Sequence, residues 1–329
     1  MKSESKRDYR LDLLRVMAIC MIVFMHSPRP GSAPGYVLSG LSYITASGLV
    51  LFFMISGALL LGTNLSTKEF LKRRFSKILW PTLFWTFFYL VVYCLSNSLS
   101  VHEVLKSVFS IPFSVQGHGV LWFMYTLAGL YLLTPILSRW LKSSSKREIE
   151  FYLMLWCVTL IYPYLSLVLF INETNTGLLY YFAGYVGYFV LGFYLKHCYI
   201  FRPWHLIVSI GMAIIVPALV YSSGIQFDFY SMLWYLSLPV AALAFSWYVI
   251  ASRLPNKQIR IIEQCSKLSF GVYFVHVVFL RHFLWKVSLI HNLPGFLQII
   301  VIASITLVLS YLLSWLISQL PFRKYIIGI

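Results

Sequence analysis

Ten runs of mostly apolar residues follow one another along the chain, and they constrain its fold more than any other feature. A helix needs about 20 such residues to cross the hydrocarbon core of a bilayer. The composition agrees, since 60% of the residues are hydrophobic and 11% are charged. The sequence therefore predicts an all-α, polytopic membrane helical bundle of about ten transmembrane helices. The runs cover residues 11–27, 41–62, 79–96, 119–138, 151–171, 178–196, 205–222, 231–251, 268–285 and 296–318.

The basic residues indicate how the bundle is oriented. With the N-terminus placed inside, 22 of the 26 Lys and Arg residues fall in inner segments, and the exceptions are Arg29, Lys106, Arg281 and Lys286. The positive-inside rule then predicts that both termini are cytoplasmic. The net charge of +16 therefore reflects topology. The charged pieces are too short to form a basic face for nucleic acid.

No connection between the runs is long enough for a soluble domain, and the longest covers roughly 97–118. We expect residues 1–329 to form a single membrane domain with no appended soluble domain. The first run starts beside Arg15 and has no A-x-A-like cleavage site, so we expect it to be retained as a span. The five cysteines are scattered without a C-x-x-C pair. This spacing predicts neither a disulfide framework nor a metal site.

Two ionisable residues in the first run, Arg15 and His26, point to a functional site. They are eleven positions apart, which is about 16 Å and close to three turns of a helix, so they share a face with Asp12. In the ninth run His276 lies nine residues beyond Lys267, about 13 Å into its span. The two histidines are therefore predicted to meet at similar depth, where imidazole groups are suited to proton transfer. The alternative is that Arg15 anchors the interface and His26 caps the outer end.

These residues resemble the acyltransferase 3 family of bacterial integral-membrane acyltransferases. The family signature in the first span is an arginine, ten residues and a histidine, which matches Arg15 and His26 in YRLDLLRVMAICMIVFMH. The similarity extends over most of the chain, in the expected order. It continues through FFMISGALLL, then FLKRRFSKILWP with Arg74, Lys77 and Pro81, then LWFMYTLAGLYLLTPIL, YFAGYVGYFVLGFYL and KLSFGVYFVH.

The resemblance implies transfer of an acyl group, usually acetyl, from cytoplasmic acyl-CoA to a hydroxyl of a surface glycan or its lipid-linked precursor. It places the chain in the bacterial cytoplasmic membrane as a multi-pass protein. His26 would be the base or acyl-relay residue, and Arg15 would help to hold the donor. Arg74 and Lys77, with Arg73 beside them, are expected to bind the phosphates of acetyl-CoA, and no metal is expected.

The acceptor side of the reaction is predicted from its chemistry. A sugar hydroxyl is a poor nucleophile, so it needs a base, for which His26 and His276 are the candidates. The tetrahedral intermediate needs hydrogen-bond donors, and Ser56, Trp122 and Tyr125 are polar groups inside predicted spans. The alternative role of these three residues is structural pairing between helices.

Two other classes of function are compatible with the sequence. A transporter or flippase for a lipid-linked saccharide would use the histidines as a proton relay, and a membrane sensor or assembly partner would transfer no group. The ten acidic residues all fall near the ends of the predicted spans. Proton-coupled carriers commonly bury carboxylates in mid-span, so the acidic residues favour the acyltransferase interpretation.

Overall fold

The chain consists of helices and their connections wherever the computed structural model describes it, and those residues contain no strand. The prediction of an all-α fold is confirmed for this part of the chain. Arg29, Arg281 and Lys286, which entered the topology prediction, lie outside it. The described residues are 7–27, 35–97, 100, 102–103, 105–106, 121–169, 177–224, 227–280, 284, 287, 290 and 292–329.

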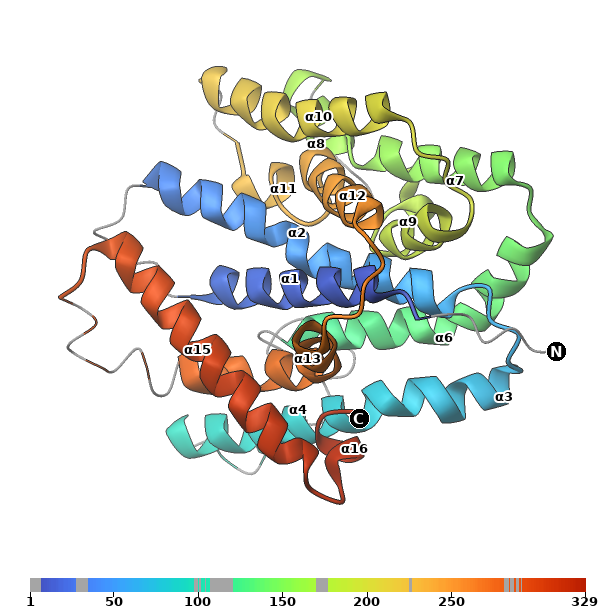
Figure 1. The fold of residues 1–329 in the computed structure, drawn as a ribbon. Helices are drawn as coiled ribbons and strands as arrows, with labels where there is room; N and C mark the ends of the chain where they lie inside the picture. The colour runs from blue at the N-terminus through green and yellow to red at the C-terminus, as the bar shows by residue number, and fades with distance from the viewer. Residues whose placement is uncertain are drawn as a thin grey trace.

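The longer helices coincide with the apolar runs (Figure 1). They are α1 (Tyr9–His26), α2 (Gly35–Leu60), α4 (Ser76–Asn97), α6 (Trp122–Ser143), α7 (Lys146–Thr159), α8 (Tyr162–Leu169), α9 (Val186–His197), α10 (Pro203–Ser222), α12 (Leu238–Arg253), α13 (Arg260–Val278) and α15 (Gly295–Ser318). Short helical segments accompany them: α3 (Thr67–Phe70), the π-helical turn η1 (Leu71–Phe75), the 3₁₀ turn η3 (Tyr180–Phe182), α11 (Phe229–Met232) and α16 (Arg323–Ile326).

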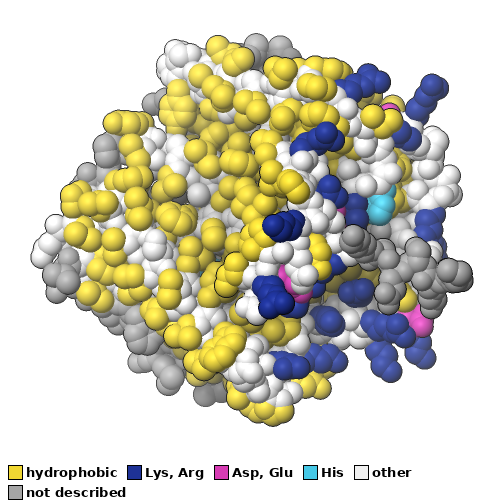
Figure 2. Space-filling view, viewed as in Figure 1, with side chains coloured by type: hydrophobic (Ala, Val, Ile, Leu, Met, Phe, Trp, Pro, Cys, Tyr) yellow, Lys and Arg dark blue, Asp and Glu magenta, His cyan; other side chains and the backbone are white. Residues whose placement is uncertain are grey.

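Four helices of the described chain are long and apolar enough to cross a membrane by length and composition alone. They are Gly35–Leu60, the continuous helix Thr67–Cys94, Pro203–Ser222 and Gly295–Ser318. The total of ten crossings and the cytoplasmic position of both termini remain predictions. Figure 2 shows that Lys and Arg side chains gather on the side of the molecule where the N-terminus lies, next to a broad hydrophobic surface. This one-sided distribution is typical of a membrane protein.

Several apolar runs do not form single long helices. The run 231–251, for example, forms the end of α11 and then α12. The run 151–171 divides into α7 and α8, and Pro163 explains the break because proline cannot donate a helical hydrogen bond. The run 178–196 forms η3 and then α9, which has 12 residues. At 1.5 Å per residue α9 is about 18 Å long, short of the ~30 Å hydrocarbon core. Irregular backbone precedes it, and the Trp156 Nε1–H donates to the Gly184 carbonyl oxygen at 3.0 Å.

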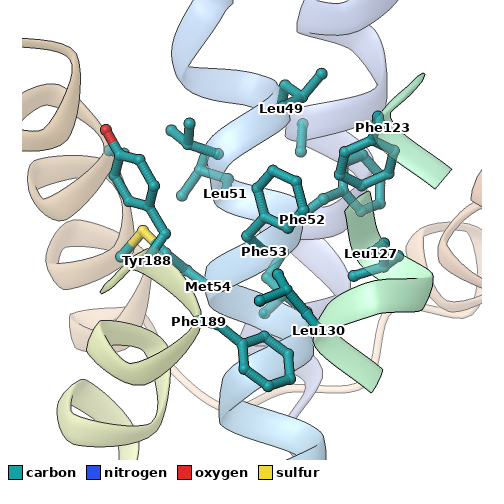
Figure 3. Close-up of a cluster of buried hydrophobic side chains, with 14 of the residues drawn as sticks. Leu49, Leu51, Phe52, Phe53, Met54, Phe123, Leu127, Leu130, Tyr188 and Phe189 are labelled. Atoms are coloured by element: carbon teal, nitrogen blue, oxygen red, sulfur yellow. The ribbon is translucent and has the colours of Figure 1, made fainter. Parts of the chain in front are cut away.

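Helix α2 lies in the core, packed against α1 on one side and α9 on the other (Figures 1 and 3). Glycines let α2 and α9 touch through their backbones. A Cβ at Gly57 would lie 1.7 Å from the Phe189 carbonyl oxygen, and one at Gly192 would lie 1.8 Å from that of Met54. Small residues allow this close approach between membrane helices. The contact fixes α2 in place, and α1 packs on α2.

Candidate active site

Helices α1 and α13 bring two histidines together. His26 is the last residue of α1, and His276 lies in the last turn of α13. The Nε2 atom of His276 is 3.4 Å from Nδ1 of His26, and the ring centroids are 5.1 Å apart. His276 is fully buried and His26 is partly buried. The two residues therefore meet at a similar depth, as their positions in the sequence predicted.

Backbone carbonyls fix where the protons of this pair lie. Nδ1 of His276 is 2.5 Å from the Tyr273 carbonyl oxygen, and Nδ1 of His26 is 2.9 Å from that of Ile22. A carbonyl only accepts hydrogen bonds, so each Nδ1 carries a proton and each neutral ring has its lone pair on Nε2. The single Nδ1–H of His26 is then shared between the Ile22 carbonyl oxygen and, more weakly, Nε2 of His276. Nε2 of His26 is the nitrogen that would take up a proton, and His276 would stabilise the resulting cation.

Arg15 is held by a serine of the neighbouring helix. Its Nη1 donates to Ser266 Oγ at 3.3 Å, and Ser266 Oγ donates to Asp12 Oδ1 at 2.7 Å. No carboxylate in the described residues lies within ion-pair distance of Arg15 itself. The guanidinium is therefore positioned without a direct counter-ion, an arrangement suited to binding an anionic ligand. Arg15 lies about 16 Å along α1 from His26, so the two mark opposite ends of one helix face.

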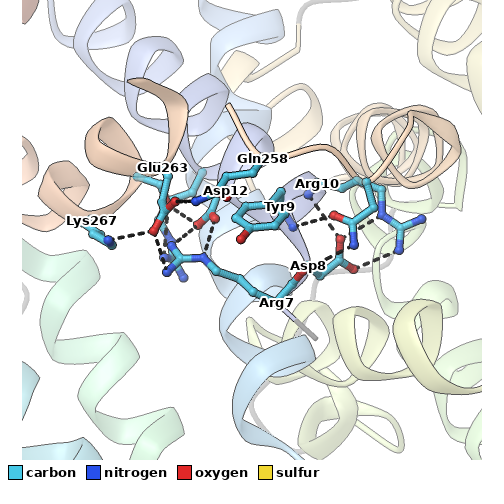
Figure 4. A network of polar contacts seen from close by, with 11 residues as sticks. Arg7, Asp8, Tyr9, Arg10, Asp12, Gln258, Glu263 and Lys267 are labelled. Carbon is cyan, nitrogen blue, oxygen red and sulfur yellow. Dashed lines mark hydrogen bonds and ion pairs between the residues drawn. The ribbon is translucent and has the colours of Figure 1, made fainter. Parts of the chain in front are cut away.

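An ion-pair network near the N-terminus joins the start of α1 to the start of α13 (Figure 4). Arg7 donates to Asp12 at 2.9 Å and 3.1 Å, and Arg7 Nη1 lies 3.3 Å from Glu263. Lys267 lies 2.8 Å from the same Glu263 oxygen. Hydrogen bonds from Lys267 and Gln258 lower the pKa of Glu263. The network holds Asp12 where Ser266 meets it.

The basic cluster predicted to bind the donor lies on the π-helical turn η1 and the first turn of α4. Arg73, Arg74 and Lys77 are all exposed, and Arg73 Nη2 lies 4.0 Å from Glu69 Oε1. π-helical turns inside α-helices occur frequently at functional sites. All three side chains are thus accessible to a ligand.

One buried tyrosine, Tyr131, lies within electrostatic range of both this basic cluster and Arg15. Tyr131 of α6 packs its ring 6.1 Å from that of Phe70, just before η1. Its hydroxyl interacts with Ser56, and the positive charges of Arg15 and Arg74 both act on it. Tyr131, which was not predicted, therefore lies next to Ser56 and within electrostatic range of Arg15 and Arg74. Ser56 lies on the Arg15 side of the site.

The other two predicted acceptor residues lie elsewhere. The Trp122 ring packs 5.5 Å from Tyr185 and 5.4 Å from Tyr235. The Tyr235 hydroxyl lies 3.3 Å from the sulfur of Met25, the residue before His26. Trp122 is therefore two side-chain contacts from Met25. Tyr125 shares a 2.7 Å hydrogen bond with Thr86 of α4, which fits helix pairing.

Three residues of this arrangement were missed from the sequence: Ser266, Tyr131 and Tyr235. Ser266 had a usable signal, because it is a small polar residue next to Lys267, at the depth where Arg15 enters the first span. Tyrosines are too numerous in this chain, at 23, for Tyr131 or Tyr235 to stand out. In the described part of the chain no group of three or more His, Cys, Asp or Glu side chains could hold a metal ion. The five cysteines are all free.

Comparison with known proteins adds one finding. A family model described as an acyltransferase domain, that of the acyltransferase 3 family, matches residues 8–315, which is nearly the whole chain. No curated protein and no solved structure matches the chain significantly.

Proposed function

This chain belongs to the acyltransferase 3 family, and on that premise we propose that it is a membrane O-acyltransferase acting on a glycan. It moves an acyl group, acetyl in the simplest case, from cytoplasmic acyl-CoA to a hydroxyl of a cell-surface polysaccharide or its lipid-linked precursor. It does so in the cytoplasmic membrane of a bacterium. The observation that carries the proposal is the contact between His26 and His276, because it joins two potential acid–base groups inside a membrane bundle.

In the proposed reaction, Nε2 of His26 removes the proton of the acceptor hydroxyl as its oxygen attacks the thioester carbonyl carbon. The new C–O bond forms, the C–S bond breaks, and the thiolate of CoA leaves. The proton on His26 then passes to the sulfur, which gives the free thiol and restores the base. His276 supports this step because its Nε2 lone pair faces the Nδ1–H of His26 and stabilises the cation. A route in which His26 briefly carries the acyl group uses the same pair.

The donor would be held on the inner side. The phosphates of CoA favour guanidinium groups, which bind phosphate oxygens in pairs. Arg74, with Arg73 and Lys77, offers exposed positive charge at η1, and Arg15 offers a partly buried one. Both Arg15 and Arg74 act on Tyr131, which supports a single binding path from the surface to Arg15. The thioester end would then extend along the Arg15 face of α1 toward His26.

The acceptor would approach the other end of α1. Aromatic side chains bind sugars through their apolar faces. Trp122 contacts Tyr235, whose hydroxyl contacts Met25, the residue before His26. We assign Trp122 to acceptor binding on that basis. Ser56 is assigned to the donor side, where it neighbours Tyr131. Tyr125 has the weakest support, because its hydroxyl pairs with Thr86.

The experiment that tests this function supplies inside-out membrane vesicles with radiolabelled acetyl-CoA and follows the label into lipid-linked and surface glycan. Vesicles from the same strain without the protein are the control. Label that depends on the protein supports acyl transfer. No transfer, with the native acceptor and with acetyl, succinyl and longer donors supplied, would favour the transporter or flippase alternative. That alternative is tested in the same vesicles by following movement of the lipid-linked saccharide across the membrane.

A further inference from the structure

The residues that follow α15 fold back against α4, a helix that is far from α15 in the sequence. Helix α16 lies beside α4, and the C-terminus lies next to it (Figure 1). The Trp85 Nε1–H donates to the Ile326 carbonyl oxygen at 2.9 Å. The rings of Trp80 and Tyr325 meet edge to face, 6.0 Å apart. Two tryptophans of α4 thus bind residues 325–328, which we call the return segment.

Ile327 anchors the return segment in the bundle. Its side chain is 1% exposed, although its neighbours Tyr325 and Ile329 are largely exposed. A Cβ at Gly271 of α13 would lie 3.1 Å from Ile327 Cγ2 and 2.7 Å from Ser314 Oγ. Ile327 therefore sits where α13 and α15 meet, about 8 Å along α13 from His276. Burial of this side chain anchors the segment between the two helices.

Gly328 lies against the backbone of a residue assigned to donor binding. It has a φ of +75°, which favours glycine. A Cβ at this position would lie 2.5 Å from the Lys77 carbonyl oxygen and 3.6 Å from Pro81 Cγ. Pro81 has no N–H to donate to that carbonyl, so α4 lacks one helical hydrogen bond here, shortly after the π-helical turn. The return segment covers this weak point.

We propose that the return segment is a positioning element: it fixes the position of η1 and Lys77 relative to α13, and this position is required for donor binding. It contacts α4 at Trp85 and Lys77, and it contacts α13 at Gly271. It therefore joins the helix that follows the donor-binding turn to the helix that carries Ser266 and His276. The inference rests on the proposed function in its donor-binding role, and it lies in residues beyond the family match, which ends at 315.

The test replaces the glycine and measures η1 directly. Gly328→Val places a side chain against the Lys77 carbonyl. Trp85→Phe removes the N–H that binds Ile326 and keeps a ring in place. The matched control is Gly224→Ala, because Gly224 has a φ of +67° but a Cβ there meets nothing within 4 Å. For each variant in nanodiscs we measure the rate of trypsin cleavage at residues 72–74 and the dissociation constant for CoA.

We expect Gly328→Val to speed cleavage at residues 72–74 and to weaken CoA binding by about tenfold, the scale of one lost charge-assisted contact. Trp85→Phe should change both in the same direction, and Gly224→Ala should change neither. At saturating donor, turnover of both test variants should stay near wild type. Unchanged cleavage and unchanged CoA binding would overturn the proposal, and so would faster cleavage with unchanged binding.

Two further outcomes are distinguishable. If Gly328→Val fails to accumulate, Trp85→Phe alone is used: faster cleavage with weaker CoA binding supports the proposal, and the contrary results given above overturn it. If the wild-type protein does not bind CoA, the donor assignment of the proposed function fails, and with it the donor-binding role of the segment. The cleavage rates then still show whether the segment orders η1.

Discussion

Nε2 of His276 lies 3.4 Å from Nδ1 of His26, although the two residues are 250 positions apart in the chain. Each Nδ1 also faces a carbonyl of its own helix, so both rings are held in one tautomer. In the proposed reaction, Nε2 of His26 takes the proton of the acceptor while His276 lies against Nδ1 of the same ring. The two histidines are expected to act as one unit.

Replacing His276 tests that unit. His276→Gln keeps a polar side chain but removes the imidazole that accepts from His26. We expect turnover to fall by about 10²-fold, the lower end of what acid–base groups contribute, with the KM for acyl-CoA unchanged. His205→Gln is the control, because His205 pairs with Tyr199 on a different part of the molecule. A His276→Gln variant with wild-type turnover would show that His276 only packs against His26.

Ser266 is expected to hold Arg15 in place, because its hydroxyl links the Arg15 guanidinium to the Asp12 carboxylate. Ser266→Ala removes the hydroxyl that accepts from Arg15 and donates to Asp12. Leaving these buried groups without it should cost about 1–3 kcal/mol of stability and should raise the KM for the donor. Ser269→Ala is the matched control, because Ser269 is equally buried on α13 but donates only to a carbonyl of its own helix. Thermal unfolding and donor kinetics of the two variants provide the comparison, and equal results would contradict the role of Ser266.

Arg74 is expected to bind the donor by its guanidinium geometry as well as its charge. Arg74→Ala should raise the KM for acyl-CoA by about tenfold or more, the value of a charge-assisted contact, with little change in kcat. Arg74→Lys should give an intermediate KM, because a lysine keeps the charge but not the paired donors. Lys68→Ala removes the same charge from the same exposed region. If it raises the KM as much as Arg74→Ala does, the effect is only electrostatic attraction.

The network at Glu263 predicts a pH-dependent stability. Lys267 and Gln258 lower the pKa of Glu263 in the folded protein, so folding favours its ionised form. Its contribution is present above the unfolded value of about 4.3 and is lost as the pH falls through the lower folded value. Glu263→Gln should therefore lower the melting temperature at pH 7, and the difference from wild type should shrink as the pH falls below the unfolded value of about 4.3. Glu148→Gln, on an exposed helix, controls for the loss of one surface charge.

Much of the arrangement could be predicted from hydrophobicity and helix geometry. The apolar runs gave the positions of the long helices because a membrane helix depends mainly on local sequence. The meeting of His26 and His276 followed from counting residues inward from charged ends. Arg15 and Arg74 were selected separately, by a signature, and both act on Tyr131 in the structure.

The remaining features depend on contacts between distant segments. The π-helical turn at 71–75 cannot be distinguished from an α-helix by periodicity over five residues. Ser266 contacts Asp12 and Arg15 across 254 and 251 positions, and no local pattern records that pairing. Helix α9 is short because Trp156 satisfies the backbone at Gly184, which hydropathy does not detect. The packing of the return segment could not be predicted either, because its partners Trp85 and Lys77 lie 241 or more positions away in the sequence.

The most direct test of the central claim compares wild type with His26→Ala at matched expression. Both proteins are purified in nanodiscs, and CoA binding and transfer of radiolabelled acetyl to the glycan acceptor are measured together. We predict that His26→Ala loses transfer by about 10²–10⁴-fold, the contribution of a general base, and binds CoA as tightly as wild type does. Transfer by His26→Ala at the wild-type rate would contradict the assignment of His26 as the base and the account built on it.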